Sequence, residues 1–387
     1  MYCSSCGRGS SLSLALRHGP CRVQVKEFFM GAPVKESTSR KFELPCNEGK
    51  RIEDFIELQR KELGAGGYGV VCEGKDKHTA ISYAVKLIQK TRLTNMEKLE
   101  KEIRIMTKLD HPNVVKLFQT FQDSRYVYLV MEMCQGGELF DRIIEEKHFT
   151  EKDAATVMQQ VFRGIHYTHA VDIVHRDLKP ENLMLLNKGP IKGNTVKVID
   201  YGIAAEWKGE LLVSKNGTLD YMAPELIDLL THRSQGYGKE LDVWSCGVIL
   251  HVLLSGMLPF KGKNDQETLQ KICAGKLTWR GFDKYNISKE ARDLIEKLLT
   301  VNKEKRATMQ QALRHTWIEH TAPTARSVPL SEVVVNLENF THANKLKMKA
   351  LGLVARHIDD GSRAQAPPAR DIRDSERYCS VRDISRY

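Results

Sequence analysis

The sequence lacks any run of about 18 or more apolar residues, which is the length that a membrane-spanning helix needs. Residues 11–16 (SLSLAL) are too short and too polar for the core of a signal peptide. Residue 2 is Tyr, so the Met-Gly start required for N-myristoylation is missing. We therefore expect a cytoplasmic protein without a transmembrane segment, and leave a nuclear or membrane-associated location open.

Cysteine is present without the spacing of a disulfide scaffold. The nine cysteines are odd in number and irregularly placed, which favours a reducing compartment. Cys3 and Cys6 form a lone CxxC pair, and a zinc site would need two more ligands at suitable spacing. Acylation of either cysteine remains an alternative, so the role of this pair stays open.

The charge balance is basic, with a formal net charge of +10 and a pI of about 9.0. A basic balance is compatible with nucleic acid, membrane surfaces or acidic partners. No nucleic-acid-binding motif and no basic surface with interleaved aromatics accompany it, which disfavours a nucleic-acid binder. The 41% hydrophobic and 28% charged residues are typical of a globular protein, here expected to be a monomer.

The order of the patterns predicts an α+β protein with two lobes. Strand-like runs dominate before residue 133, and helical patterns follow the glycines at 136–137. A cleft between two such lobes is a favoured place for a ligand. The predicted organisation is a disordered tail (1–50), one domain (51–320, with lobes at about 51–133 and 137–320), a linker and basic amphipathic helix (321–358), and a disordered tail (359–387).

Individual elements follow from periodicity. Two strands are predicted at Ile81–Ile88 and Tyr126–Glu132. The basic helix is expected over 337–358, after a linker at 321–335. Helical spacing predicts further helices at Leu93–Leu109, Phe140–Glu146, Asp153–Ala170, Leu241–Ser255, Ser288–Leu299 and Met309–His320.

A glycine-rich motif and a lone lysine come first along the chain. Gly64, Gly66 and Gly69 form GxGxxG between two strand signals, which argues against a dinucleotide-binding turn at a strand–helix junction. Glycines let the backbone approach phosphates closely. Lys86 interrupts the apolar strand YAVKLI, and a buried lysine needs a partner such as Glu102. The alternative is an edge-strand lysine that faces water.

The most specific motif is His175–Asn182 (HRDLKPEN). It places a carboxylate, a lysine and an amide at fixed spacing, and phosphoryl transfer needs these groups. Further along the chain come Asp200-Tyr201-Gly202, Ala223-Pro224-Glu225, and then Asp242 and Arg306.

In these motifs and their order, residues 55–320 resemble the eukaryotic protein kinase family, with its bilobal fold and its cofactors ATP and Mg²⁺. The resemblance implies that Lys86 holds the α- and β-phosphates and pairs with Glu102. Asp177 would accept the proton of the substrate hydroxyl, and Lys179 would neutralise the moving phosphoryl group. Asn182 and Asp200 would hold Mg²⁺, while Glu225, Asp242 and Arg306 would be structural. Tyr201 stands where Phe is commoner, which changes a packing side chain and not a metal ligand.

The same resemblance predicts the nucleotide contacts. Met131 would be the gatekeeper that narrows the back of the pocket. The ATP-binding residues implied are Leu63, Gly64, Gly66, Gly69, Val71, Ala84, Lys86, Met131, Glu132, Cys134 and Glu138. A pseudokinase that acts as a scaffold is the alternative, and it predicts loss of Lys86, Asp177 or Asp200, all of which are present.

Substrate choice is predicted from two carboxylates. Glu138 and Glu181 occupy the positions where basophilic kinases receive an arginine, and two carboxylates on one guanidinium form strong hydrogen bonds. We therefore expect Arg three residues before the acceptor. Thr218 and Leu219 match the Ser/Thr-kinase form of the peptide-binding loop.

Ser214 stands at the usual phosphorylation position of the activation loop in this family, which suggests a phosphorylation switch. A phosphate on Ser214 would pair with Arg176 and order the loop. The alternative is that Ser214 is an ordinary exposed serine.

The segment 339–351 (NFTHANKLKMKAL) resembles the autoinhibitory junction of calcium-dependent protein kinases. Apolar positions recur at 340, 343, 346, 350 and 353–354 with basic residues between them, a pattern that fits a calmodulin-type groove or an anionic membrane. The regulatory residues expected are Phe340, Lys345, Leu346 and Leu353, with calmodulin or a calmodulin-like protein binding 339–357. A helix packed permanently on the large lobe is the alternative.

Calcium control would have to come from outside this sequence. It contains no EF-hand loop, and Asp359-Asp360-Gly361 is only a fragment of one. We therefore expect either control through a separate calcium-binding partner or a calcium-independent kinase.

Overall fold

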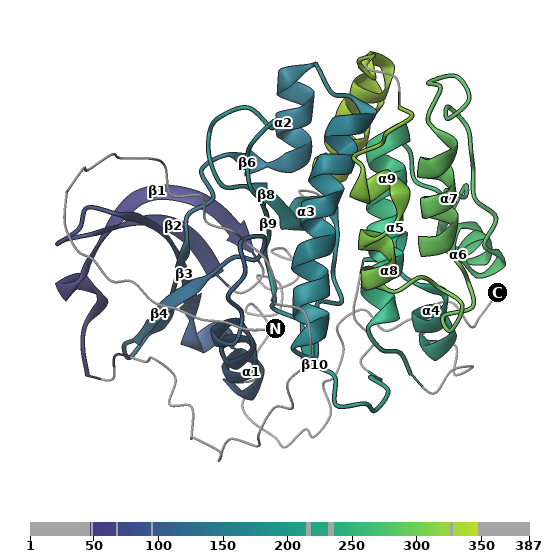
Figure 1. Ribbon diagram of the computed structural model, residues 1–387. Coiled ribbons are helices and arrows are strands. Elements are labelled where there is room, and N and C mark those ends of the chain that lie inside the picture. Colours follow the sequence, from purple (N-terminus) through teal and green to yellow (C-terminus); the bar gives the residue numbers. More distant parts are fainter. Residues whose placement is uncertain are drawn as a thin grey trace, which may run out of the picture. The chain divides into compact units, whose positions relative to one another are not determined.

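A computed structural model of the chain describes residues 47, 49–66, 69–93, 96–213, 218–230, 236–325 and 328–346. The predictions for the N-terminal tail up to residue 46, for Ser214, for Leu353 and for the C-terminal tail 359–387 lie outside the described residues. The remainder forms a small β-rich lobe followed by a helical lobe (Figure 1).

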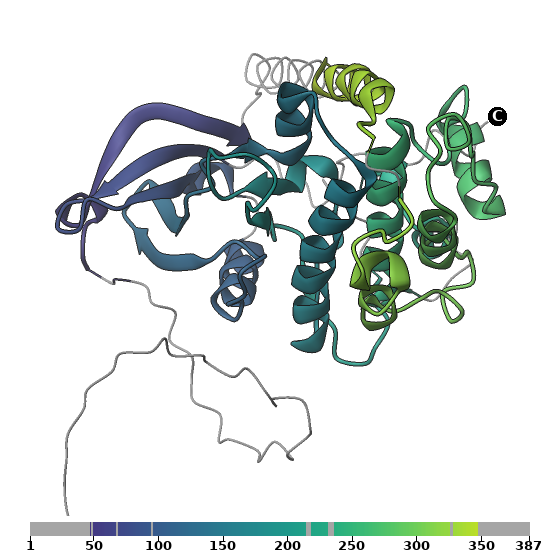
Figure 2. The same cartoon turned by 45° about the horizontal axis from the view of Figure 1, so that its top comes forward.

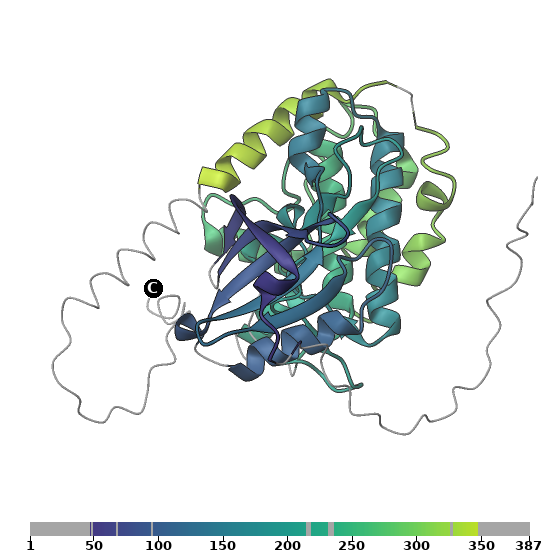
Figure 3. The same cartoon turned by 90° about the vertical axis from the view of Figure 1, so that its left-hand side faces the viewer.

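The small lobe is one antiparallel five-stranded sheet with the order β1-β2-β3-β5-β4, which Figure 3 shows from its outer side. β-branched and aromatic residues, which favour strands, are frequent in the interior strands β3 (SYAVKLIQ) and β5 (YVYLVME). The interior strand β5 spans Tyr126–Glu132, which confirms the prediction. The other strands are β1 (Ile56–Gly66), β2 (Gly69–Asp76), β3 (Ser82–Gln89) and β4 (Leu117–Gln122).

The register of the sheet decides which side chains face the cleft. Lys86 of β3 lies opposite Val71 of β2 and Leu129 of β5, so these three share one face. Val85, one residue away, points to the other face and is fully buried in a separate small apolar cluster. Alternation along β3 therefore sends the lysine to the interior side of the sheet.

Helix α1 (Met96–Thr107) packs against the sheet. Its buried residues Leu99, Ile103 and Met106 recur at helical spacing and join the main core. The helix lies within the predicted range Leu93–Leu109.

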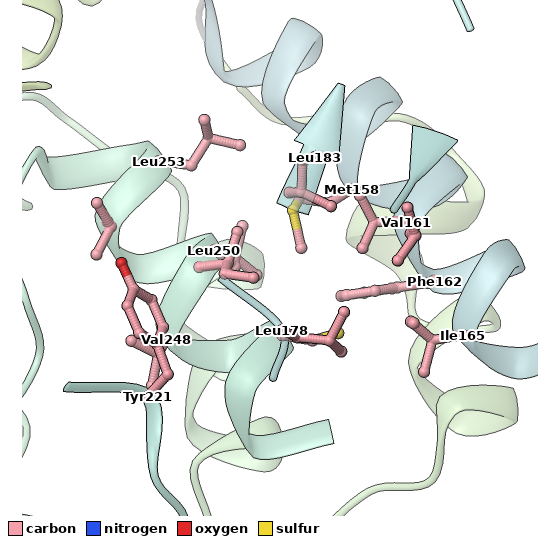
Figure 4. Close-up of a cluster of buried hydrophobic side chains, with 14 of the residues drawn as sticks. Met158, Val161, Phe162, Ile165, Leu178, Leu183, Tyr221, Val248, Leu250 and Leu253 are labelled. Atoms are coloured by element: carbon pink, nitrogen blue, oxygen red, sulfur yellow. The ribbon is translucent and has the colours of Figure 1, made fainter. Parts of the chain in front are cut away.

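The large lobe is built around two long helices, α3 (Glu151–Ala170) and α5 (Glu240–Ser255). A capping box starts α3, because Thr150 Oγ1 accepts from the Asp153 amide while the Asp153 carboxylate accepts from the Thr150 amide. Figure 4 shows side chains of both helices meeting those of the intervening loop, including Phe162, Leu178 and Leu250. This core anchors the segment between the two helices.

Short elements complete the large lobe. They are β6 (Gly137–Glu138), α2 (Leu139–Glu146), β7 (Ile173–Val174), η3 (Pro180–Asn182), β8 (Leu183–Leu185), β9 (Val196–Val198), β10 (Ala205–Glu206), η4 (Leu219–Tyr221), α4 (Pro224–Leu230), α6 (Asp265–Ala274), α7 (Lys289–Leu298), α8 (Met309–Leu313) and α9 (Thr316–Glu319). β6, β8 and β9 pair into a three-stranded sheet, and β7 pairs with β10.

The single helix predicted over Met309–His320 is wrong. The chain forms α8 and α9 with a break at His315. The His315 ring explains the break: Nδ1 accepts from the Trp317 amide at 3.3 Å, and Nε2 lies 2.7 Å from the Asp293 carboxylate. A side chain that caps a new helix and bridges to α7 favours restarting the helix over continuing it.

The C-terminal helix begins at residue 331, not at 337, and is helical to residue 346, the last residue described. It lies beside α2 (Figure 2) with Val333, Val334 and Leu337 buried. Asn336 fixes its position by donating to the Ser255 carbonyl at 3.2 Å and to the Tyr285 hydroxyl at 3.0 Å. In the described part of the chain, no helix is both long and apolar enough to span a bilayer.

Candidate active site

The loop that carries Asp177 is held from below by Asp242 of α5. The buried Asp242 carboxylate accepts from the backbone N–H groups of His175 (2.9 Å) and Arg176 (2.8 Å). Its Oδ2 also lies 2.8 Å from His169 Nε2. Although burial alone would raise the pKa of Asp242, its hydrogen bond with His169 holds that pKa below the usual value. These contacts fix the loop, as expected for a structural Asp242.

Three of the predicted site residues, Lys179, Thr218 and Asn182, contact Asp177. Its carboxylate accepts from Lys179 Nζ at 2.5 Å and from Thr218 Oγ1 at 2.9 Å. Asn182 Nδ2 donates to the Asp177 carbonyl at 2.8 Å. A carboxylate, a mobile cation and a hydroxyl at one point can position an incoming hydroxyl and receive its proton.

The donor set for a metal fits a hard divalent cation. Asn182 uses its amide N–H for the loop, which directs its amide oxygen elsewhere. Asp200 is exposed, with a left-handed φ of 65°, and one of its oxygens accepts from the Gly202 amide. Amide and carboxylate oxygens are ligands that Mg²⁺ uses together with phosphate oxygens. Among the described residues, no three metal-ligating His, Cys, Asp or Glu side chains gather at one place.

Lys86 and Glu102 form the predicted pair. Lys86 Nζ lies 2.9 Å from Glu102 Oε1, and only 22% and 11% of the two side chains are exposed. The edge-strand alternative is wrong, because β3 lies between β2 and β5. A Cβ built on Gly202 would lie 3.1 Å from Asp200 Oδ1 and 3.7 Å from Glu102 Oε2, so the segment after Asp200 packs closely against this pair.

The predicted nucleotide-binding residues line up on the sheet. Gly64 lies opposite Val71, and Ala84 lies opposite Met131. A Cβ on Gly69 would lie 2.0 Å from the Leu87 carbonyl oxygen, so β2 and β3 need glycine there. Leu63, further along β1, is 41% exposed. Gly66 ends β1 and lies opposite Gly69 of β2.

The connection between the lobes contains a buried ion pair that sequence reasoning missed. Lys197 of β9 is 5% exposed, and its Nζ lies 2.7 Å from Glu132 Oε2. Burial and the neighbouring Glu132 raise the pKa of the Cys134 thiol to about 12, so this thiol stays protonated. The signal for Lys197 was visible, because it interrupts the apolar run VKVI as Lys86 interrupts YAVKLI.

An acidic cluster lies at the start of α2. Lys345 Nζ lies 2.5 Å from Asp141 Oδ2 and 3.9 Å from Glu138 Oε2. Glu181 Oε2 is buried and accepts no hydrogen bond among the described atoms. Burial raises the pKa of Glu138, and Lys345 opposes that shift. Asp141 was missed, although its place three residues after Glu138 on a helix could have indicated it.

The pKa of Lys345 is shifted by the same acidic cluster. Burial alone would lower the pKa of Lys345, but the hydrogen bond to Asp141 and the charge of Glu138 outweigh it and raise the pKa. On the same helix Phe340 packs half-buried against the main core, whereas the Leu346 side chain is 69% exposed. Of the four expected regulatory positions here, Leu353 lies outside the described residues.

Arg176 is already bound within the loop region. Its guanidinium donates to the carbonyls of Ile203 (2.5 Å) and Ala204 (3.4 Å) and to the Tyr237 hydroxyl (3.2 Å). Its backbone has a left-handed φ of 72°. The expected pairing with phosphorylated Ser214 stays a prediction.

Glu225 and Arg306 form a two-pronged buried pair, with N–O distances of 2.7 and 2.8 Å. Arg306 also donates to the Thr300 and Glu240 carbonyls, and its guanidinium carbon lies 5.0 Å from the centre of the Trp244 ring. The pair links α4 to the segment before α8, beneath the loop that carries Leu219.

Comparison with known proteins agrees with this geometry. A family profile described as "Protein kinase domain" matches residues 58–318. "Calcium-dependent protein kinase 3" of Plasmodium berghei (strain Anka) is 37% identical over 313 residues, which are 80% of this chain and 55% of that protein. "Calcium-dependent protein kinase 32" of Arabidopsis thaliana is 40% identical over 318 residues, 81% of this chain and 57% of that protein. The chain thus spans about half the length of the curated relatives it matches.

Proposed function

Because the chain belongs to the protein kinase family, we propose that it transfers the γ-phosphoryl group of Mg-ATP to Ser or Thr of proteins with Arg three residues before the acceptor. We further propose that its C-terminal helix restrains this activity. The observation that carries the catalytic part is the meeting of Asp177, Lys179 and Thr218 in hydrogen-bonding distance.

The residues around Asp177 have separate tasks in this reaction. Asp177 orients the substrate hydroxyl and takes its proton, while Lys179 offsets negative charge on the transferring group. Lys86, kept in place by Glu102, holds the nucleotide phosphates. Asn182 and Asp200 would hold Mg²⁺, which would neutralise charge on the phosphates when bound. The Thr218 hydroxyl keeps the Asp177 carboxylate oriented in the absence of substrate.

The acidic cluster supports the preference for arginine. Glu138 and Glu181 lie near each other, since the charge of Glu181 acts on the Glu138 carboxyl and helps to raise its pKa, after burial and Asp141. A buried carboxylate oxygen without a hydrogen bond, such as Glu181 Oε2, is costly unless a donor reaches it. A guanidinium carries several N–H donors in a planar fork and would satisfy two carboxylates at once.

Lys345 supports the restraining role of the helix. It is a cation held by Asp141 and Glu138, in the place where the substrate arginine is expected. The helix is fixed there by apolar packing at Val333, Val334 and Leu337. Release would need a partner that binds residues 339–357 as a basic amphipathic helix, and a calmodulin-like protein has the required chemistry. The names of the relatives, calcium-dependent protein kinases, agree with such a partner.

The catalytic proposal is tested by Asp177→Asn. The amide keeps the size of the carboxylate but cannot take the proton, so phosphorylation of an Arg-x-x-Ser peptide should fall by roughly 10²–10⁴-fold. The thermal midpoint of unfolding should stay unchanged, which separates lost chemistry from lost fold. Unchanged turnover in this variant would refute the catalytic role and favour the scaffold alternative.

The restraint is tested by Lys345→Glu in the full chain. A negative charge beside Glu138 and Asp141 repels, so the helix should leave the cleft and the apparent KM for the peptide should fall by about 3–10-fold. His342→Glu adds a negative charge at an exposed position of the same helix and should change KM little. Ca²⁺/calmodulin should reproduce the effect of Lys345→Glu on the wild type. Equal activity in all three proteins, with or without Ca²⁺/calmodulin, would show a permanently packed helix and a constitutive kinase.

A further inference from the structure

A cavity lies between the C-terminal helix and the large lobe, away from the expected ATP-binding residues. Its volume is about 720 Å³, within the range of small-molecule sites. The helix contributes Asn339, Phe340 and Ala343, which recur at helical spacing and thus form one side of the cavity. The opposite side comes from the loops that follow α5 and α6. The cavity therefore exists in this form only while the helix is docked.

Part of the cavity lining, here called its floor, is apolar. Met257, Leu258 and Pro259 line it from the large lobe, and Phe340 lines it from the helix. Asn339 and Asn344 of the helix add polar amide groups at its edge. An occupant can thus bury an organic part while its polar groups face the rim.

The charged residues of the lining, here called its rim, carry an excess of positive charge. Lys261, Lys271, Lys276 and Arg280 line the cavity, against one carboxylate, Asp220. Lys271 is committed, since it pairs with Glu267 and donates to the Lys261 carbonyl.

The other three cations of the rim are exposed. Within the described part of the chain, neither Lys261, Lys276 nor Arg280 forms an ion pair or a side-chain hydrogen bond. A concave surface with several unpaired charges of one sign concentrates ligands of the opposite sign.

We propose that this cavity binds a small organic polyanion with two or more phosphate groups, and that the ligand holds the C-terminal helix on the large lobe. The three unpaired cations lie on two loops, Lys261 after α5 and Lys276 and Arg280 after α6, so phosphates on different arms of one ligand can each meet a cation. Arg280 can bind a phosphate through two parallel N–H donors. The apolar floor accepts the organic frame that carries the phosphates.

Regulation follows from the shared walls of the cavity. A ligand that contacts both the helix and the lobe binds the docked state and stabilises it in proportion to its concentration. On the proposed function, this ligand would keep Lys345 at Glu138 and Asp141 and oppose release by a calmodulin-like partner. The regulatory consequence rests on that proposal, whereas the binding site itself does not.

Binding is tested by calorimetry on the full chain with inositol hexakisphosphate at about 0.15 M salt, where weak surface attraction is screened. The double variant Lys276→Glu/Arg280→Glu should lose roughly tenfold or more in affinity, since two attractive charges become repulsive. The matched control is Lys289→Glu/Lys305→Glu, which makes the same charge change at two exposed lysines beside α7 and α8. Equal affinity of wild type, cavity variant and control, or no binding by wild type, would overturn the site.

Two sources can supply this chemistry, a free polyphosphate or a lipid headgroup. Flotation with phosphatidylcholine vesicles, with and without phosphatidylinositol bisphosphate, separates them in the same variants. Binding to vesicles that the cavity variant loses supports the site and assigns a lipid source. Binding of inositol hexakisphosphate without vesicle binding supports the site and assigns a free ligand.

Bridging is tested by hydrogen exchange of the amides of residues 331–346. Saturating inositol hexakisphosphate should slow their exchange about fivefold or more in wild type and leave it unchanged in the cavity variant. Binding without slower exchange would overturn the bridging part. Slower exchange without a change in kinase activity would leave the site standing and would count against the autoinhibition proposed above.

Discussion

The charges beneath the catalytic loop and the charges at the edge of the cleft are built differently. The side chains of Arg306 and Asp242 are at most 1% exposed, and each has several hydrogen-bond partners. Lys345 and Glu138 are 43% and 36% exposed, and their closest approach is 3.9 Å. The first group is fixed by partners that cannot be exchanged without breaking the core. The second can exchange partners at little cost, which is what the proposed arginine-binding site and the proposed restraint by the C-terminal helix require.

In the burial of its ion pair, Lys197 is intermediate between these two groups. Its side chain is 6% exposed, nearly as buried as the structural charges, but its partner Glu132 lies in the connection between the lobes, whose residues Glu132 and Cys134 are expected to bind ATP. By holding the Glu132 side chain, Lys197 can fix the position of this connection and so the shape of the expected nucleotide site.

The largest effect is expected for Arg306→Met, which removes the cation of the buried Glu225–Arg306 pair. Methionine leaves the Glu225 carboxylate buried without a cation, which should lower the free energy of unfolding by about 3–5 kcal/mol. Denaturant unfolding measures this change. The control Lys297→Met removes an exposed partner of Asp293 and should cost under about 1 kcal/mol. Equal losses would remove the distinction between buried and exposed pairs.

A smaller effect is expected from Lys197→Met, which tests the intermediate case. The unpaired Glu132 carboxylate should shift the connection and raise KM for ATP by roughly tenfold, with little change in kcat. The second change Glu132→Gln removes the unpaired charge and should restore KM towards the wild-type value. The exposed pair Lys116–Asp110 provides the control Lys116→Met. A fall in kcat instead of a rise in KM would contradict a positioning role.

The smallest effect is expected in the pH dependence of KM for a peptide substrate, through the Glu138 carboxylate. Burial raises the pKa of Glu138, so this carboxylate gains its proton at higher pH than an ordinary one as the solution is acidified. The ionised form is the one that binds arginine. On acidification from about pH 7, KM for an Arg-x-x-Ser peptide should therefore begin to rise at a higher pH than an ordinary carboxylate would cause, while Glu138→Gln should give a higher but flat KM. An identical slope in both proteins would assign the titration to another group.

Sequence patterns predicted most of the architecture and the chemical residues, because these depend on local signals. β5 matched its predicted range, and the motif around Asp177 named the groups that the structure brings together. The family relationship follows from the same motifs, and the profile match confirms it.

What the sequence did not predict depends on contacts between distant segments. The break between α8 and α9 follows from the bridge between His315 and Asp293, which periodicity does not register. The early start of the C-terminal helix at residue 331 depends on packing of Val333 and Val334 against the lobe. Lys345 was predicted as regulatory from its basic pattern, but its partner Asp141 is 204 residues away and no local signal joins them.

Lys345 belongs to the same chain as its partners Asp141 and Glu138, so under the proposed restraint the C-terminal helix competes with substrate as an intramolecular ligand. A ligand on a tether competes at an effective concentration that its linker sets, on the order of millimolar, and that does not change with the amount of kinase in the cell. A free substrate must match this value or make tighter contacts at Glu138 and Glu181. On the proposed function, the helix therefore acts as a threshold: it excludes weak and dilute substrates even when the enzyme is abundant.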